Sequence, residues 1–229
     1  MDLKRFLDIL VLAVLSFESI SASLILFDSN WKDISANSTD SIENLKDFRY
    51  YVSGFDYDNR PVVIMDWGKW NIEWLIKQPD LKNLLKKNYE NYINELASGD
   101  FTQKMSKYLS SGQNSSDEVV IIKNYDAFDI RHVYTSESFK LCMDLLKQMQ
   151  KCFHKIEYGM VVNANAFTYQ LLDMGKPLIG NILSKFDVYG TNPEKWIPRL
   201  SRKIPLDQLP HSLGGREDFQ PLLEQSFLK

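Results

Sequence analysis

The 229-residue chain has few of the residues on which enzyme chemistry usually depends, with only two cysteines and three histidines. The histidines, His132, His154 and His211, are spread along the chain, and it has no G-x-S-x-G, H-E-x-x-H, C-x-x-C or G-x-G motif. These absences argue against a serine hydrolase, a zinc protease and a dinucleotide-dependent enzyme. We expect no catalysis and no metal. A hydrolase or lipid-modifying enzyme remains only if His132 or His154 faces a serine or cysteine within hydrogen-bond reach.

An excess of positive charge is also absent, since 27 basic residues face 30 acidic ones and the net charge is −3. The isoelectric point near 5.7 argues against a nucleic-acid partner, which would need a basic surface. Local exceptions are Lys195, Arg199, Arg202 and Lys203, which form either a basic patch for anionic lipid or a solvated helix face. Trp196 beside them is either an interfacial anchor or a core residue.

The two cysteines, Cys142 and Cys152, are not spaced for a disulfide. If residues 136–154 form one helix, the two Cα atoms lie about 15 Å apart along its axis at about 1.5 Å per residue. A disulfide needs Cα atoms within about 7 Å. We therefore expect two buried thiols on the sheet-facing side of this helix.

The N-terminus has a basic pair, a short apolar run at residues 9–15 and small residues at 19–23, which is typical of a secretory signal peptide. We predict a signal peptide over residues 1–23 and a polar lead-in over residues 24–44. The alternatives are an amphipathic first helix of a cytosolic protein and an uncleaved anchor reaching Leu26. Sequons at Asn37 and Asn114 are compatible with a secreted glycoprotein.

Short apolar runs alternate with helical patterns in the remainder of the chain. The runs at 61–67, 118–124, 160–164 and 185–190 predict strands, and the last alternates as an edge strand does. Spacing of apolar residues predicts helices over 80–97, 101–109 and 136–153, and a short helix is expected near 44–52. Helical crossovers between strands imply one α/β domain with a mostly parallel central sheet flanked by helices.

Five segments in order carry a resemblance to a known family. They are FRYYVSGFDYDNRPVVIMDWG (48–68), EYGMVVN (157–163), AFTYQLLDMGKPL (166–178), ILSKFDVYGTN (182–192) and LDQLPHSLGG (206–215). Their order resembles the CRAL-TRIO lipid-binding domain, the family of the phosphatidylinositol-transfer and tocopherol-transfer proteins. The resemblance covers residues 45–215, which leaves residues 216–229 as a C-terminal tail.

The resemblance implies an apolar lipid pocket on one face of the sheet, closed by a gating helix. Strand alternation and the resemblance together predict these ligand-binding residues: Met65, Trp67, Ile122 and Val161 on the sheet, and Phe167, Leu171, Leu178 and Ile182 on the gate. Gly175, Gly180 and the Lys176-Pro177 pair are candidate hinges, or ordinary helix ends. The resemblance places Lys185 at the position of the family's phosphate-binding lysine. It places His154 at an acidic position of the family, which argues against phosphatidylinositol as the ligand.

From this resemblance we expect a carrier of a phospholipid, a tocopherol-like lipid or another isoprenoid lipid, with no cofactor besides that lipid. The carrier would be a monomer that contacts membranes transiently, and would be secreted. The alternative location is the cytoplasm, with peripheral membrane attachment. The alternative function is a protein-interaction module that uses the same fold without lipid transfer, and a pocket filled by bulky side chains would favour it.

Overall fold

The computed structural model describes residues 44–229. The predicted signal peptide, all but the last residue of the polar lead-in and the Asn37 sequon lie outside the described residues. Asn114 lies inside them, exposed in the loop before the third strand of the sheet. Its surroundings therefore leave room for a glycan.

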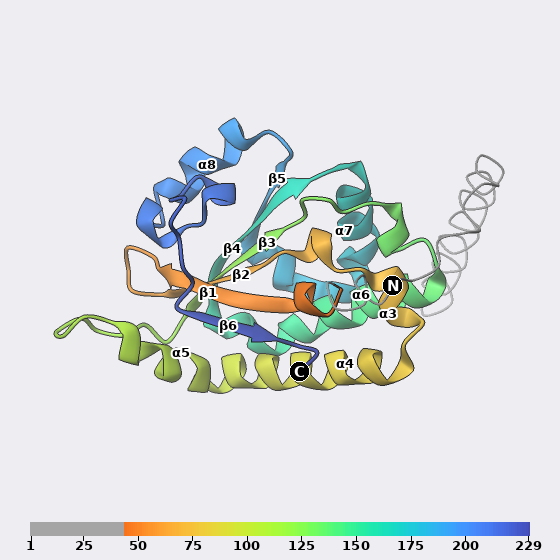
Figure 1. Cartoon of the computed structure of the whole chain (residues 1–229), viewed down its shortest axis with the longest axis horizontal. Coiled ribbons are helices and arrows are strands. Elements are labelled where there is room, and N and C mark those ends of the chain that lie inside the picture. The colour runs from red at the N-terminus through yellow and green to blue at the C-terminus, as the bar shows by residue number, and fades with distance from the viewer. Residues whose placement is uncertain (1–43) are drawn as a thin grey trace.

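A six-stranded sheet forms the centre of the protein, in the order β5-β4-β3-β2-β1-β6 (Figure 1). Its strands are β1 (Arg49–Phe55), β2 (Pro61–Met65), β3 (Val119–Asn124), β4 (Ile156–Ala164), β5 (Phe186–Gly190) and β6 (Leu223–Ser226). Strands β2 to β5 pair in parallel, and β1 pairs antiparallel with both β2 and β6. The predicted mostly parallel sheet is confirmed, with β5 as an edge strand.

The short helix predicted near residues 44–52 is mostly wrong. The helix ends at Asp47, and residues from Arg49 onward form β1 instead. Tyr50 and Val52 are buried on one face of this strand, while Tyr51 packs on the opposite face. This period of two is a strand pattern, and pairing with β2 on one side and β6 on the other makes it favourable.

The last strand, β6, lies in the segment predicted as a tail. Its residues pair with β1, from Arg49 opposite Ser226 to Val52 opposite Leu223. The chain then turns inward, so that Phe227 and Leu228 are buried in the main core. The C-terminus thus completes the sheet edge that β1 would otherwise expose.

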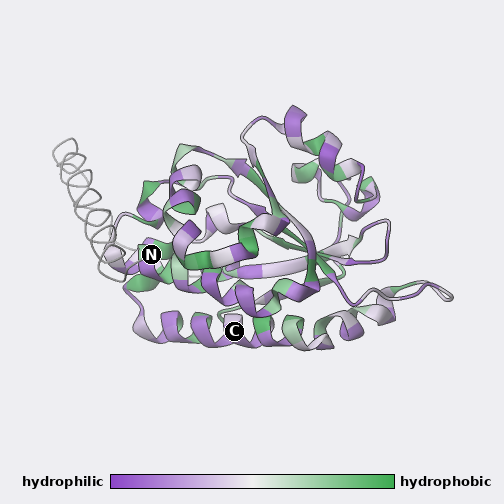
Figure 2. Cartoon of the chain, turned by 180° about the vertical axis from the view of Figure 1, so that it is seen from behind, coloured by the Kyte–Doolittle hydropathy of each residue, from purple (hydrophilic) through white to green (hydrophobic). Residues whose placement is uncertain are grey.

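Helices cover both faces of the sheet. They are η1 (Trp67–Lys69), α3 (Ile72–Ile76), α4 (Pro79–Ser98), α5 (Asp100–Met105), η2 (Ser106–Tyr108), η3 (Ile130–His132), α6 (Ser136–Gln148), η4 (Met149–Lys155), α7 (Ala166–Ile179), η5 (Gly180–Lys185), α8 (Pro193–Ser201), η6 (Leu206–Gln208) and η7 (His211–Leu213). The larger core lies between the sheet and α3, α4, α6 and α7, and the smaller one lies beneath α8 (Figure 1). The hydropathy view shows green strands between helices that carry purple segments (Figure 2). Apolar residues are therefore buried on both faces of the sheet, as expected for parallel strands.

The predicted helix over residues 136–153 changes character near its end. It is α-helical to Gln148 and continues as the 3-10 helix η4 through Lys155. Cys142 and Cys152 are free and buried in the main core, which confirms the two predicted thiols. Cys152 lies in the 3-10 helix η4, which places it in the main core shortly before β4.

Two turns shape the same end of the molecule. Asp56 accepts hydrogen bonds from the backbone N–H groups of Asp58 and Arg60, at 3.0 and 2.8 Å, and so shapes the turn into β2. In the segment after α8, Gly214 has φ +85°, and a Cβ on Gly215 would lie 1.9 Å from the carbonyl oxygen of Leu209. Both glycines are therefore required by the backbone.

Candidate ligand-binding site

The predicted sheet residues of the pocket lie on one face, with one exception. Met65, Trp67 and Val161 belong to the main core beneath α4, α6 and α7, and each is at most 2% exposed. Ile122 instead belongs to the smaller core beneath α8. Its assignment to the pocket is wrong, because the side chains of one strand alternate between the two faces.

The register identifies the residue that takes the place of Ile122. Lys123 is the partner of Met65 on β2 and of Val161 on β4. Partners in adjacent parallel strands point to the same face, so Lys123 occupies the middle of the predicted pocket row. It is 2% exposed, and its Nζ atom lies 4.0 Å from the centre of the Trp67 ring. The strand pattern did not single out this residue, although Lys123 is the only charged side chain in the apolar run VVIIKN.

The predicted gate residues come together on α7 and the turn that follows it. Leu171 and Ile182 are each 2% exposed in the main core, and Phe167 and Leu178 are partly buried against it. Asn165 begins the helix, because its side chain accepts a hydrogen bond from the backbone N–H of Thr168 at 3.0 Å. The apolar side of α7 therefore faces the same core as Met65 and Val161.

The candidate hinges have different roles. A Cβ on Gly175 would lie 2.9 Å from the sulfur of Met143, so this glycine allows α7 to pack closely on α6. Gly180 has φ +59° and ends α7. The side-chain amide of Gln150 donates a hydrogen bond to the carbonyl of Ile179 at this point, which joins the end of α7 to η4.

Lys185 lies at the edge of the site rather than inside it. Its Nζ atom is 5.2 Å from the centre of the Phe153 ring. The ring of His154 contacts the carbonyl oxygen of Ala97 at 3.2 Å, and Lys155 pairs with Asp117. Neither His154 nor Lys155 supplies the carboxylate of the family motif.

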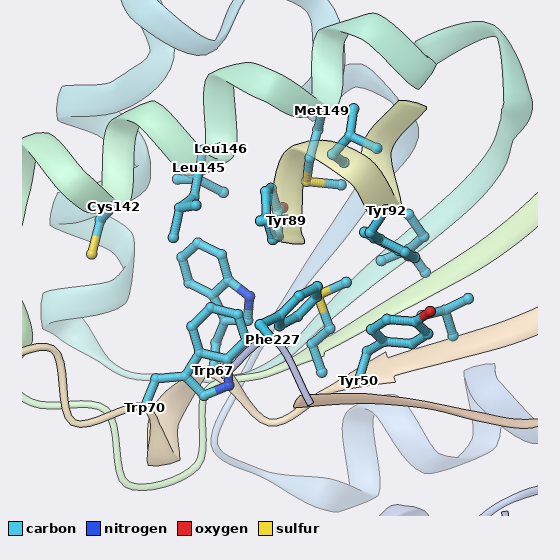
Figure 3. Packing of buried hydrophobic residues seen from close by; sticks show 14 of the residues in the cluster. Tyr50, Trp67, Trp70, Tyr89, Tyr92, Cys142, Leu145, Leu146, Met149 and Phe227 are labelled. Atoms are coloured by element: carbon cyan, nitrogen blue, oxygen red, sulfur yellow. The ribbon is translucent and has the colours of Figure 1, made fainter. Parts of the chain in front are cut away.

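The interior beside these residues is rich in aromatic side chains (Figure 3). Trp67 and Trp70 stack with ring centres 5.1 Å apart, and Phe227 lies between Trp70 and the tyrosines of α4. Five aromatic polar atoms of this core have no hydrogen-bond partner within residues 44–229: Nε1 of Trp67 and Trp70, and the hydroxyls of Tyr89, Tyr92 and Tyr125. Buried polar groups are normally satisfied, so these five atoms are unusual, and each of them can donate a hydrogen bond.

A polar hollow opens beside η1 and η3. It has a volume of about 330 Å³, and its lining includes Asn71, Glu73, Arg131 and His132. His132 is mostly buried and not a surface histidine, and burial lowers the pKa of its ring despite the nearby Asp129. The mixed charges of this hollow do not match the apolar pocket expected for a lipid chain.

On and after α8, the tryptophan is buried whereas the basic residues next to it are exposed. Trp196 is 2% exposed in the smaller core, which makes it a core residue and not an interfacial anchor. Lys195, Arg199 and Arg202 are exposed, and Lys203 is exposed with its Nζ atom 4.0 Å from the centre of the Tyr158 ring. The patch is therefore a solvated face with charges available to a surface.

In the part of the chain that the structure describes, histidine, cysteine and carboxylate side chains do not gather into a metal site or a histidine–nucleophile pair. No group of three or more His, Cys, Asp or Glu side chains within residues 44–229 is placed to hold a metal. The ring of His132 contacts Asp129, and that of His154 contacts a backbone carbonyl, and neither ring shows a hydrogen bond to a serine or cysteine.

Within residues 44–229, no helix has both the length and the apolar character needed to cross a membrane.

Comparisons with known proteins agree with this geometry. The family model described as the CRAL/TRIO domain matches residues 45–215. Comparison with curated proteins gave no match. Among solved structures, the chain is similar to the one titled "Crystal structure of Sfh5", with 15% identity and a TM-score of 0.50. That match covers 84% of this chain and 62% of the other, and it supports the fold alone.

Proposed function

Because the chain belongs to the CRAL/TRIO family, a family of lipid-binding and lipid-transfer domains, we propose that it binds one lipid inside and carries it between membranes without catalysis. The lipid would lie on the sheet face that carries Met65 and Val161, beneath α7. Phospholipids and tocopherol-like or other isoprenoid lipids are the ligand classes of this proposal.

One observation carries the proposal more than any other: α7 presents apolar side chains to the same face of the sheet as the predicted pocket row. Leu171 and Ile182 lie in one core with Met65 and Val161. Outward movement of α7 would open that face and expose a continuous apolar surface. An amphipathic helix can lie at a bilayer surface, so lipid exchange would occur there.

The position of Gly180 supports such a movement. The left-handed backbone at this residue separates α7 from η5, and the Gln150 side chain joins the end of the helix to η4. The glycine allows the chain to change direction here, while Ile179 just before it is fully buried in the main core and must leave it when the helix moves. Gly180 would serve as the hinge of this movement.

The same core also supports a second candidate function. The bulky rings of Trp67, Trp70 and Phe227 pack against one another in the same core (Figure 3). A filled interior is what a protein-interaction module would have. The two functions differ in whether α7 moves and lipid enters.

The deciding experiment is native mass spectrometry of the full chain produced in a eukaryotic secretory host, followed by organic extraction of the bound lipid. A carrier gives one lipid per protein and takes up fluorescent phosphatidylcholine or tocopherol from vesicles. Alanine at Leu171 or Ile182 should reduce lipid retention, whereas alanine at exposed Tyr169 on the same helix should not. Unchanged retention in both core variants would contradict the gate.

The same spectrum reports the mature N-terminus. We propose secretion after cleavage near residues 21–23, and a mass that starts at residue 22 to 24 would support it. A protein that starts at Met1, holds no lipid and takes none from vesicles would favour a cytosolic interaction module instead.

A further inference from the structure

Lys123 is a cation placed inside an apolar core. It is 2% exposed and lies between Met65 and Val161 on the central strands of the sheet. Lysine is almost never fully buried without a partner, because an ammonium ion loses its hydration there. Within residues 44–229, its Nζ atom has no hydrogen-bond partner, and its one polar contact is the face of the Trp67 ring.

No acidic side chain compensates this charge. The groups of α6 and η4 that act electrostatically on Lys123 are the thiols of Cys142 and Cys152. Burial raises the pKa of both thiols to about 12, so they are neutral at physiological pH. Burial also lowers the pKa of Lys123 to about 7, because the ammonium ion loses its hydration and no acidic side chain compensates that loss.

The neighbouring polar atoms are mostly hydrogen-bond donors. Tyr89 is within electrostatic range of Cys152 and of Tyr125, and Tyr92 is within range of Cys152 and Tyr89. Their hydroxyls have no partner among the described residues, and the same holds for the indole N–H groups of Trp67 and Trp70. An indole can only donate, and a phenol can donate, so the site offers protons to an acceptor.

Unpartnered indoles alone do not define a site. Trp196 has an unpartnered indole as well, in the smaller core on the other face of the sheet. Among the buried side-chain atoms without a partner in the described residues, Oε1 of Gln148 alone can accept but not donate. What distinguishes the main core is a buried cation together with several donors on one face of the sheet.

We propose that Lys123 binds the oxyanion head group of a lipid, a carboxylate or a phosphate monoester, inside the main core. The head group would accept hydrogen bonds from Lys123 and from donors such as Tyr89 and Tyr125, while the alkyl chain would extend toward α7. This inference rests on the proposed lipid-binding function and adds the polarity of the ligand and its orientation.

Two other ligand chemistries fit the site less well. A neutral isoprenoid lipid would leave the Lys123 charge without a partner in a closed core, at the cost of desolvating it. A polyphosphorylated head group would bring several negative charges to a single cation. One terminal oxyanion matches the single positive charge, and the aromatic donors satisfy its remaining lone pairs.

The test compares three single-chain ligands by titration calorimetry on the full chain: laurate, dodecyl phosphate and dodecan-1-ol. We expect one of the two anions to bind wild-type protein at least tenfold more tightly than the alcohol. Which anion binds better distinguishes the carboxylate from the phosphate source. Equal affinity for the alcohol and both anions would overturn the proposal without any variant.

The variant K123M removes the charge at similar volume. We expect it to lose at least tenfold in affinity for the preferred anion and to bind the alcohol within threefold of wild type. The matched control is K151M, an exposed lysine on η4 that pairs with Glu90 at 2.8 Å and faces away from the core. K123M that binds the anion as wild type does would refute the role of Lys123, whatever else it binds.

Failure of this inference and of the proposed function can be told apart. If extracted lipid is present but neutral, and wild type prefers the alcohol, the carrier function stands and the oxyanion site falls. If no lipid is retained and none of the three ligands binds, both fall together. If K123M does not fold, the wild-type comparison of anion and alcohol still decides the oxyanion preference.

Discussion

Burial and charge oppose each other at Lys123 more than at any other lysine described in the structure. The amine is enclosed by the main core, and its charge meets only the face of an indole. A cation over a Trp ring gains some electrostatic attraction, yet this does not replace a counter-ion. The residue therefore costs stability while the core holds no ligand.

This cost predicts a pH dependence of stability. The pKa of Lys123 is about 7 in the folded protein and 10.5 in its ordinary state. Below pH 7 both states hold the proton, so the penalty is complete. Between 7 and 10.5 the unfolded chain binds more protons, and the free energy of unfolding therefore rises with pH by at most about 1.4 kcal/mol per unit.

Urea unfolding of wild type and K123M between pH 7 and 9 measures this effect. The range stops at 9 because the thiols of Cys142 and Cys152, whose ordinary pKa is 9.0, are half ionised there in the unfolded chain and oppose the trend. K123M should be at least as stable as wild type at pH 7, since a buried charge is exchanged for an apolar side chain. Its advantage should shrink as pH rises; parallel curves would contradict the lowered pKa.

Arg60 is a second residue at which charge is concentrated. Its guanidinium lies 3.3 Å from Asp56, 2.6 Å from Asp58 and 3.1 Å from Glu118. The Asp56 side chain is only 2% exposed and also accepts a hydrogen bond from Tyr158 at 3.2 Å. Arg60 thus joins the turn before β2 to the beginning of β3.

Replacing Arg60 with alanine should lower the free energy of unfolding by about 2 kcal/mol, because a buried carboxylate loses its cation but keeps other hydrogen bonds. Thermal and urea unfolding measure the loss. The control is R49A, which removes an exposed pair with Glu224 and should cost at most about 1 kcal/mol. Equal effects of the two variants would show that the Arg60 cluster is no more than a surface network.

At the scale of elements, α7 is the helix that the proposed lipid exchange would move. Its middle is packed on α6 through Gly175 and Met143. Its end is held by the Gln150 hydrogen bond and by Ile179, which is fully buried in the main core. Since the hinge is placed at Gly180, we expect the end of the helix to loosen before its packed middle leaves α6.

The variant Q150A tests this order. Loss of one hydrogen bond should cost about 1 kcal/mol or less overall, yet amide exchange in the last turn of α7 should become several-fold faster while β4 is unchanged. Lipid release to vesicles should accelerate with it. K176A, which removes only the exposed pair between Lys176 and Asp173, is the control and should alter neither rate. Uniform acceleration across the sheet would argue against local opening.

At the scale of the whole molecule, the C-terminus is part of the core. Phe227 lies with its ring centre 5.3 to 5.8 Å from those of Tyr50, Trp70, Tyr89 and Tyr92. Its backbone N–H also donates to the carbonyl of Phe48 at 2.8 Å. Phe48, near the start of the described residues, and Phe227, near their end, are thereby joined within the main core.

Replacing Phe227 with alanine should destabilise the protein by about 3 to 5 kcal/mol, because a fully buried aromatic side chain leaves a cavity. Chemical denaturation measures the change. F219A is the matched control, since Phe219 is only partly buried and packs its ring against that of Tyr51; it should cost at most about 1 kcal/mol. A similar loss for both would mean that the C-terminal segment adds little to the core.

Much of the fold could be predicted from local patterns of apolar residues in the sequence. Apolar runs identified β2 to β5, and helical spacing identified α4 and α6. The beginning and end of the sheet were not found. β1 has a polar preceding segment that suggested a helix, and β6 is too short and polar to be recognised without its partner.

The candidate site shows the same division. Apolar runs and helical spacing by themselves determined an α/β domain, because these patterns depend on side-chain chemistry and local period, and the order of the motifs indicated the CRAL-TRIO family. Only the tertiary structure decided that Lys123, and not Ile122, faces the main core with Met65 and Val161. Register between strands distant in sequence fixes which face each side chain takes, and a shift of one residue exchanges the two faces.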